Sequence, residues 1–265
     1  SAEGLGAAPD CSTFGGQAVA GYGSAVSGAG DVNGDGYDDI LVGAPGYLVE
    51  GQHTGAVFLF YGSENGPSLS PAWTQNFQSP DARFGAALSG VGDLNRDGYA
   101  DLIVGAPGYG TATDLSMGAI FVYYGSPDGP SSVADIQVIG DQPVAYLGNS
   151  VASAGDINED GFGDLVYAAK GVTFDQPNEG IVHVALGSNY PQLPVVWSAT
   201  GDKADAYFGF SVSSAGDVNG DGLVDLAVGA PDYKVNQTVI GRAFLFLGQD
   251  GDVFPNRVYL PLLNR

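Results

Sequence analysis

An acidic loop that recurs four times holds the residues with the clearest potential for chemistry. Its first copy, residues 31–39, reads DVNGDGYDD. Side-chain oxygens at positions 1, 3 and 5, a glycine at position 6 and a backbone carbonyl at position 7 are what a hard divalent cation requires of a short loop. Position 9 adds a further carboxylate. The sequence therefore predicts a metal-binding loop in every copy.

The predicted ligands stand at positions 1, 3, 5, 7 and 9, the seventh through its backbone carbonyl. They are Asp31, Asn33, Asp35, Tyr37 and Asp39; Asp93, Asn95, Asp97, Tyr99 and Asp101; Asp156, Asn158, Asp160, Phe162 and Asp164; and Asp217, Asn219, Asp221, Leu223 and Asp225. This set offers too many oxygens for Mg²⁺, which keeps its waters, and no soft ligand for zinc. We expect Ca²⁺, about four ions per chain. The alternative is that these clusters of Asp, Asn and Gly only form turns.

The loops are not EF-hands, because position 12 lacks the bidentate glutamate of that motif. The residues at this position lie inside short apolar runs and are Val42, Val104, Tyr167 and Val228. Short apolar runs bounded by Gly or Ala favour strands over helices.

The spacing of the loops makes them markers of a longer repeat. From Asp31 to Asp93, Asp156 and Asp217 the steps are 62, 63 and 61 residues. A period of this size indicates a propeller, a solenoid or another repeat array.

Matching features extend each repeat well beyond its loop. In the second repeat, an aromatic–glycine pair at 84–85 precedes the loop, and a Gly-Ala-Pro site at 105–107 and an apolar run at 118–125 follow it. Trp73, Ile136 and Trp197 mark a further strand, so we expect four strands per repeat. The third repeat departs from the pattern, with Lys170 in place of proline and His183 in place of phenylalanine.

At residues 84–85, 93–101 and 105–107 the chain resembles the FG-GAP repeats of the integrin α-subunit β-propeller. In that family each repeat is a four-stranded blade whose Asp loop, between strands one and two, binds calcium. The resemblance implies an all-β fold: a β-propeller of four FG-GAP blades, each with four antiparallel strands and one Ca²⁺-binding loop. Integrin propellers have seven blades, so four blades either close into a small ring or complete themselves in an assembly.

The repeat pattern also suggests domain boundaries. We expect an N-terminal segment at 1–16, a possible surplus strand, and a four-bladed propeller at 17–265, with blades at about 17–79, 80–142, 143–203 and 204–265. Residues 258–263 would be the fourth strand of the last blade. Cys11 falls at a fourth-strand position, where we expect a small buried side chain; pairing with a cysteine of another molecule is the alternative.

The chain is strongly acidic, with 30 Asp and Glu against 8 Lys and Arg and a formal net charge of −22. This charge disfavours nucleic acid and bare anionic membranes as partners. No run of about 18 apolar residues suggests membrane insertion. The chain begins at Ser1 without Met, which is compatible with a processed protein, and we expect an extracellular or cell-surface location.

Catalytic motifs are not evident, and we predict no catalytic residues and no enzyme. The two histidines, His53 and His183, have no adjacent nucleophile pattern, and His183 stands where the other repeats place a core phenylalanine. The alternative is a pair of carboxylates supplied by two distant loops.

The resemblance and the composition together suggest a calcium-binding adhesion or protein-interaction module in which calcium is structural. One alternative is a self-assembling extracellular subunit that donates a terminal strand to other copies of itself. Another is a lectin that binds glycans. The candidate partner surface consists of recurring aromatic residues in the loops between strands two and three: Tyr47, Tyr109, Phe174 and Tyr233.

Overall fold

The computed structural model describes residues 9, 11–111 and 115–249, and these form an all-β structure without helices. Among them, no segment forms a helix that is long and apolar enough to cross a membrane.

Four sheets follow one another along the chain, and each holds the antiparallel strands of one repeat. We call them blades one to four. In spatial order, blade one contains β1 (Ala25–Gly30), β2 (Asp39–Ala44), β5 (Ala56–Phe60) and β6 (Trp73–Asn76). Blade two contains β7 (Ala87–Gly92), β8 (Asp101–Ala106), β9 (Ala119–Tyr123) and β10 (Ile136–Ile139).

Blade three contains β11 (Leu147–Gly155), β12 (Asp164–Ala169), β13 (Ile181–Ala185) and β14 (Val195–Thr200). Blade four contains β15 (Ser211–Gly216), β16 (Asp225–Ala230) and β19 (Arg242–Phe246). Two short hairpins, β3 (Leu48–Val49) with β4 (Gln52–His53) and β17 (Lys234–Val235) with β18 (Thr238–Val239), lie between second and third strands. The predicted four-stranded antiparallel blades are confirmed for blades one to three, whereas the strand expected at 258–263 lies outside the described residues.

Small residues dominate the first strand of each blade, and apolar residues dominate the second and third. β7 reads ALSGVG, whereas β8 and β9 read DLIVGA and AIFVY and are buried at every residue. Continuous apolar runs of this kind are typical of strands covered on both faces. The small residues of the first strands let neighbouring blades approach closely.

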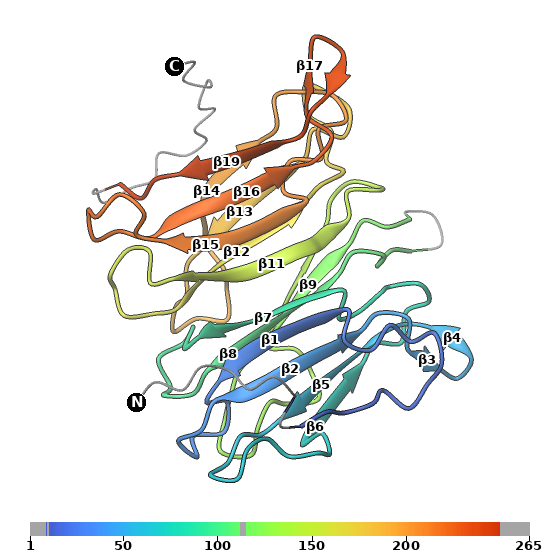
Figure 1. Cartoon of the computed structure of the whole chain (residues 1–265), viewed down its shortest axis with the longest axis vertical. Helices are drawn as coiled ribbons and strands as arrows, with labels where there is room; N and C mark the ends of the chain where they lie inside the picture. Colours follow the sequence, from blue (N-terminus) through green and yellow to red (C-terminus); the bar gives the residue numbers. More distant parts are fainter. Residues whose placement is uncertain (1–8, 10, 112–114, 250–265) are drawn as a thin grey trace.

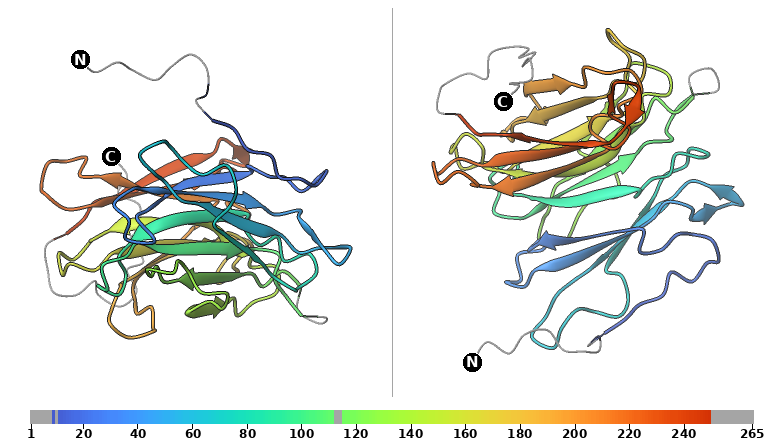
Figure 2. Two further views of the ribbon diagram at one scale, coloured as in Figure 1. Left: turned by 90° about the horizontal axis from the view of Figure 1, so that it is seen from below. Right: turned by 45° about the horizontal axis from the view of Figure 1, so that its top comes forward.

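The blades lie in chain order, from blade one at the bottom of Figure 1 to blade four at the top. Their first strands, β1, β7, β11 and β15, follow one another across the middle, where β7 contacts β1 and β11 contacts β15. The right-hand view of Figure 2 shows the same succession, with blade one and blade four at opposite ends. Within the described residues, each terminal blade therefore has one neighbouring blade.

The hydrophobic core lies between neighbouring blades. The cluster between blades one and two contains Leu41 and Leu59 from one side and Phe84, Phe121 and Tyr123 from the other, all buried. The rings of Phe84 and Phe121 meet edge to face at a centroid distance of 5.5 Å. Similar clusters join blades two and three and blades three and four. Each large side chain buried in this way contributes about 1.5–3 kcal/mol.

Side chains of the two terminal blades, one and four, are more exposed than those at equivalent positions of other blades. Val26 in β1 is 67% exposed, whereas the equivalent Leu88 in β7 is 7% exposed. At the other end, Leu245 in β19 is 51% exposed, whereas the equivalent Leu59 in β5 is fully buried. One sheet face at each end is therefore open to solvent at positions that the inner blades bury.

The N-terminal segment differs from the prediction of a surplus strand with a buried Cys11. Cys11 is exposed rather than buried, and residues 11–16, the longest described stretch of the predicted surplus strand, contain no strand. Within blade one, the place of the fourth strand is taken by β6, which pairs with β5. The segment instead lies against blade one through a 2.7 Å hydrogen bond between the Thr13 and Tyr22 hydroxyls.

Glycines of the Gly-Ala-Pro sites mark where neighbouring blades meet through their backbones. A Cβ on Gly105 would overlap the carbonyl oxygen of Gly148 in the next blade, and Gly43 approaches blade two in the same way. In the part of the chain that the structure describes, the equivalent Gly229 of blade four has no further blade beside it, and a Cβ there would first meet the Ser211 hydroxyl at 2.5 Å. Contact with the next blade therefore explains the glycine in the first two repeats.

We predict that Gly105→Ala lowers the free energy of unfolding by about 1–3 kcal/mol, because the new methyl group forces two backbones apart. Gly229→Ala is the matched control and should lose much less, since the Ser211 side chain can rotate away. Urea denaturation of both variants measures the difference. Equal losses would contradict the assignment of Gly105 as a contact between blades.

Candidate functional site

The four acidic loops all join the first strand of a blade to its second strand. Each begins directly after β1, β7, β11 or β15, and its position 9 is the first residue of the second strand. The loops lie at the left-hand ends of the blades in Figure 1. We call this side, formed by residues 31–39, 93–101, 156–164 and 217–225, the acidic face.

The carboxylate at position 1 organises the backbone of its loop. Asp31 accepts N–H bonds from Gly34 and Asp35 through Oδ1, at 2.7 and 3.0 Å, and one from Gly36 through Oδ2, at 2.8 Å. The position-1 residues of the other loops accept the N–H groups of positions 5 and 6 in the same way. The four loops therefore share one hydrogen-bonded frame.

Positions 3 and 5 lie beside each other within this frame. The amide Nδ2 of Asn33 donates to Oδ2 of Asp35 at 3.0 Å, and Oδ1 of Asp35 accepts the N–H of Tyr37. The same two contacts recur in each of the other loops. Oxygens from positions 1, 3 and 5 are thus held in one short, largely exposed turn.

Position 9 has a structural role that the sequence pattern does not reveal. Asp39 is buried, and its two oxygens accept the N–H groups of Val32, at 3.0 Å, and Gly62, at 2.9 Å. Asp101, Asp164 and Asp225 make the equivalent pairs of bonds. Each of these side chains therefore fastens its loop to the glycine that follows the third strand of the blade.

Burial and neighbouring charge raise the pKa of three position-9 carboxylates, those of Asp39, Asp101 and Asp164. Burial raises the pKa of Asp101 to about 7, and the nearby carboxylates of Asp97 and Asp93 add to the rise. Burial likewise raises the pKa of Asp164 to about 6 and shifts that of Asp39 upward. A cation beside these clustered carboxylates would therefore be favourable.

The oxygen ligands that the loops offer fit a hard cation, although the carboxylates of each loop do not all converge on one point. Within the described residues, no three His, Cys, Asp or Glu side chains come together closely enough to hold a metal ion. Position 3 is an asparagine, and position 9 faces backbone N–H groups. Amide, carboxylate and carbonyl oxygens are nevertheless the ligands that Ca²⁺ takes.

The connections between second and third strands lie on the side of the blades opposite the acidic face. The aromatic residues that we expect to form a partner surface occur in these connections. Tyr47 and Tyr109 are half-buried, and Tyr47 packs edge to face on Phe58 with centroids 5.7 Å apart. Tyr233 is 3% exposed and packs on Phe244, so its burial removes it from a partner surface. Phe174 alone among the four is exposed, at 50%.

The recurring aromatics have a common structural task. The backbone carbonyls of Tyr47, Tyr109 and Tyr233 each accept the N–H of the glycine that opens the third-strand run. In blade three this acceptor is the buried Val172, two residues before Phe174. Phe174 is therefore not equivalent to the other three, which the sequence pattern alone did not distinguish.

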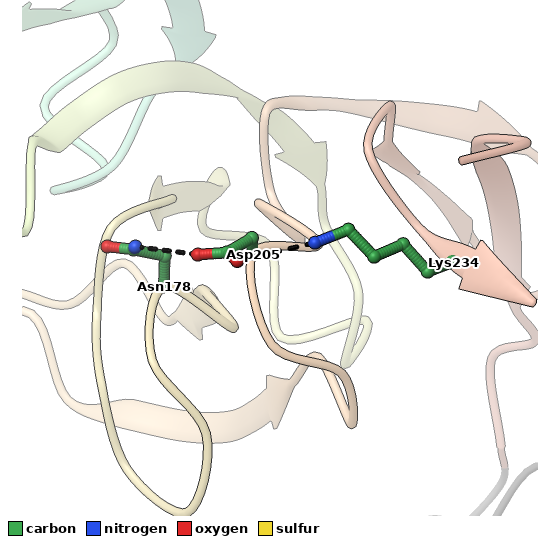
Figure 3. A network of polar contacts seen from close by, with 3 residues as sticks. All are labelled: Asn178, Asp205 and Lys234. Carbon is green, nitrogen blue, oxygen red and sulfur yellow. Dashed lines mark hydrogen bonds and ion pairs between the residues drawn. The ribbon is translucent and has the colours of Figure 1, made fainter. Parts of the chain in front are cut away.

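A polar network steadies the same side of blades three and four. Asp205 accepts a hydrogen bond from Asn178 Nδ2 at 3.0 Å and forms an ion pair with Lys234 Nζ at 3.3 Å. The three residues come from the connection after β12, the connection after β14 and β17 (Figure 3). The network therefore links separate loops of two blades.

His183 lies in β13 of blade three, where it is half-buried between the buried Val182 and Val184. It lies opposite Ser198 in the β13–β14 pair, and its Nδ1 lies 2.7 Å from the Ser198 hydroxyl. Burial lowers its pKa to about 4. The equivalent cross-strand pair in blade one is Phe58 with Thr74, so this position belongs to the sheet interior.

A family model described as FG-GAP repeat matches the chain at residues 22–60, 84–123, 147–184 and 208–246. Each matched segment begins at the residue before Gly23, Gly85, Gly148 or Gly209 and ends within the third strand of its blade. The matches together cover more than half of the chain and include all four acidic loops.

The chain is also similar to parts of larger proteins. Phosphatidylinositol-glycan-specific phospholipase D of Bos taurus is 34% identical over 246 residues, which are 86% of this chain and 28% of that protein. Integrin alpha pat-2 of Caenorhabditis briggsae is 30% identical over 231 residues, and integrin alpha-3 of Cricetulus griseus is 35% identical over 206 residues. These matches cover 79% and 73% of this chain but 18% of each integrin. The chain thus spans less than a third of the length of these relatives.

We predict that His183→Phe removes a loss of folding free energy that the wild-type protein shows as the pH falls below 7. The folded-state pKa of about 4 lies below the ordinary value of 6.5, so between these values the unfolded chain binds a proton that the folded chain does not. The free energy of unfolding therefore falls as the pH drops through this window. Relative to wild type, the variant should gain roughly 2 kcal/mol between pH 7 and pH 5.

Chemical denaturation of both proteins across this pH range measures that gain. Carboxylates titrate in both proteins and cancel in the comparison. A difference in stability that stays constant with pH would show that His183 is not buried in its neutral form.

Proposed function

Because the chain belongs to the FG-GAP repeat family, we propose that it is a calcium-stabilised interaction module that works outside the cell or at its surface. The family match and the similarity to integrin α-subunits support a role in contacts with proteins. Similarity to the phospholipase D covers only 28% of that protein, in the FG-GAP region, so we assign this chain a binding role and no catalysis.

The observation that carries the calcium proposal is the frame shared by all four acidic loops. In each, the oxygens of positions 1, 3 and 5 are held in one turn by bonds within the loop. We propose these residues and the position-7 carbonyl as ligands, with the position-9 carboxylate at the base of the site. Bound Ca²⁺ would supply positive charge to the clustered carboxylates and keep the turn closed.

The interaction surface would be the side opposite the acidic face. The connections there are longer than the acidic loops and differ among the four blades. Phe174 is exposed on this side, and the network around Asp205 steadies the loops beside it. Variable loops on a rigid scaffold are where binding proteins usually place their contacts.

We predict that removing calcium lowers the melting temperature. At a Kd of about 0.1 mM, typical of extracellular modules, about 1 mM Ca²⁺ stabilises the fold by about 1.4 kcal/mol per site. Four sites together would raise the melting temperature by roughly 10 °C or more for a domain of this size. Scanning calorimetry in Ca²⁺, in chelator and in Mg²⁺ as the control tests this, and identical melts in all three would contradict calcium binding.

A second candidate function, self-assembly, is favoured by the exposed faces of the terminal blades. Val26 and Ile40 on blade one, and Leu245 on blade four, are 67%, 38% and 51% exposed. The equivalent positions of inner blades are buried against the neighbouring blade, as Leu88 and Leu102 are. Within the chain, the outer face of each blade packs against the next blade. Blade four has no next blade among the described residues, and blade one of a second copy could take that place. We propose head-to-tail packing of copies as this assembly.

For this assembly, light scattering should give a mass that is a multiple of 26.9 kDa and that rises with concentration. Val26→Glu and Leu245→Glu should each reduce the mass to that of one chain, because each places a charge in the contact between copies. Leu69→Glu, at a loop residue that is 68% exposed, is the control and should leave the mass unchanged. A wild-type mass of 26.9 kDa at all concentrations would contradict self-assembly.

A further inference from the structure

A cavity of about 410 Å³ opens between blades two, three and four, at the strand ends opposite the acidic face. Its wall includes Arg83 and Pro107 from blade two, Tyr146 and Lys170 from blade three and Tyr207 from the start of blade four. We call this the cationic pocket. Its volume is near the lower end of the range for small-ligand sites, about 300–1,000 Å³.

The pocket is built from equivalent positions of successive repeats. Arg83, Tyr146 and Tyr207 each precede the residue–glycine pair that opens their blade, and their φ angles are 57°, 58° and 51°. This left-handed conformation is unfavourable for residues other than glycine, and blade one has Gly21 at the equivalent place. Strained backbone of this kind tends to gather at functional sites. Three large side chains are therefore held at positions where their backbone is strained.

Lys170 is the feature that distinguishes blade three at this pocket. The other repeats have proline at the equivalent position, as at Pro107. Its ammonium group lies 5.6 Å from the centre of the Tyr146 ring and 4.6 Å from that of Phe210. Asn149 accepts the Lys170 backbone N–H at 2.9 Å and donates to Gly209 O at 2.8 Å. The lysine is thus held in place by two rings and by a link between blades three and four.

Within the described residues, neither Arg83 nor Lys170 of the pocket has an acidic partner. In the described part of the chain, ion pairs are formed by Lys203 and Lys234, and none by Arg83 or Lys170. Burial lowers the pKa of Lys170, and the positive charge of Arg83 lowers it further, so the two cations act on each other. Two uncompensated cations in one pocket are unexpected in a chain with 30 acidic and 8 basic residues.

We propose that the cationic pocket binds a carboxylate group of a ligand, with Arg83 and Lys170 as its counter-charges. A guanidinium donates two parallel hydrogen bonds to a carboxylate, and the ammonium group adds a point charge. The Tyr146 and Tyr207 side chains border the site, which leaves room for a small acid or for one acidic side chain of a partner. This inference depends on the pocket residues and is independent of calcium.

The test titrates glutarate and a blocked peptide of five glutamates into the protein and follows binding by calorimetry. Lys170→Met and Arg83→Met should each weaken binding about tenfold or more, because each removes a charged hydrogen-bond donor. Lys203→Met is the matched control, at an exposed lysine outside the pocket, and should bind like wild type. Unchanged melting curves would show that the variants fold.

Binding of glutarate would support the proposal with a small acid as the source of the carboxylate. Binding of the peptide alone would support it with an acidic protein segment as the source. The proposal is overturned if neither probe binds, if Lys203→Met weakens binding as much as Lys170→Met, or if sulfate binds as tightly as glutarate. In the last case the pocket would be a general anion site.

Discussion

The blades depend on a buried carboxylate that accepts two backbone N–H groups at the start of each second strand. Asp39, Asp101, Asp164 and Asp225 each join a residue of the acidic loop to the glycine after the third strand. Removing an ionised carboxylate from water costs several kcal/mol, and hydrogen bonds to charged groups return about 1.5–3 kcal/mol each. The two bonds offset much of this cost and tie the loop to the sheet. The exposed oxygens of positions 1, 3 and 5 are therefore presented in the same way four times.

The contacts between blades follow from the same repetition. Each inner blade offers small residues near the centre of the series and large apolar side chains farther out, so neighbouring blades meet closely at glycines such as Gly105 and interlock through rings such as Phe84. Blades one and four have this surface on one side without a neighbour within the described residues. The packing that stabilises the interior thus leaves exposed apolar side chains on one face at each end of the series.

Much of the architecture could be predicted from the sequence, because the repeat period, the apolar runs and the FG-GAP pattern are local signals repeated four times. The family and the antiparallel blades are confirmed. The bracing role of Asp39 could not be predicted, since its partner Gly62 lies 23 residues away and is brought near only by folding. Tyr233 and Cys11 show the same limit, because their exposure depends on which strands and blades lie beside them.

The pocket marked by Lys170 shows what the repeat pattern hides. The sequence reveals that blade three has lost a proline there, but residues from three blades must come together before the two cations share one cavity. Lys170, where blade three departs from the repeat, is the residue that brings a second cation into this cavity.

Calcium binding by the acidic loops is tested most simply by counting the Ca²⁺ ions bound per chain at equilibrium. Equilibrium dialysis against labelled calcium, followed by the same measurement on Asp97→Ala, gives this number. We expect about four ions for the wild-type chain, one per loop, and one fewer for the variant. No bound calcium at millimolar concentration, or an unchanged count in the variant, would contradict it.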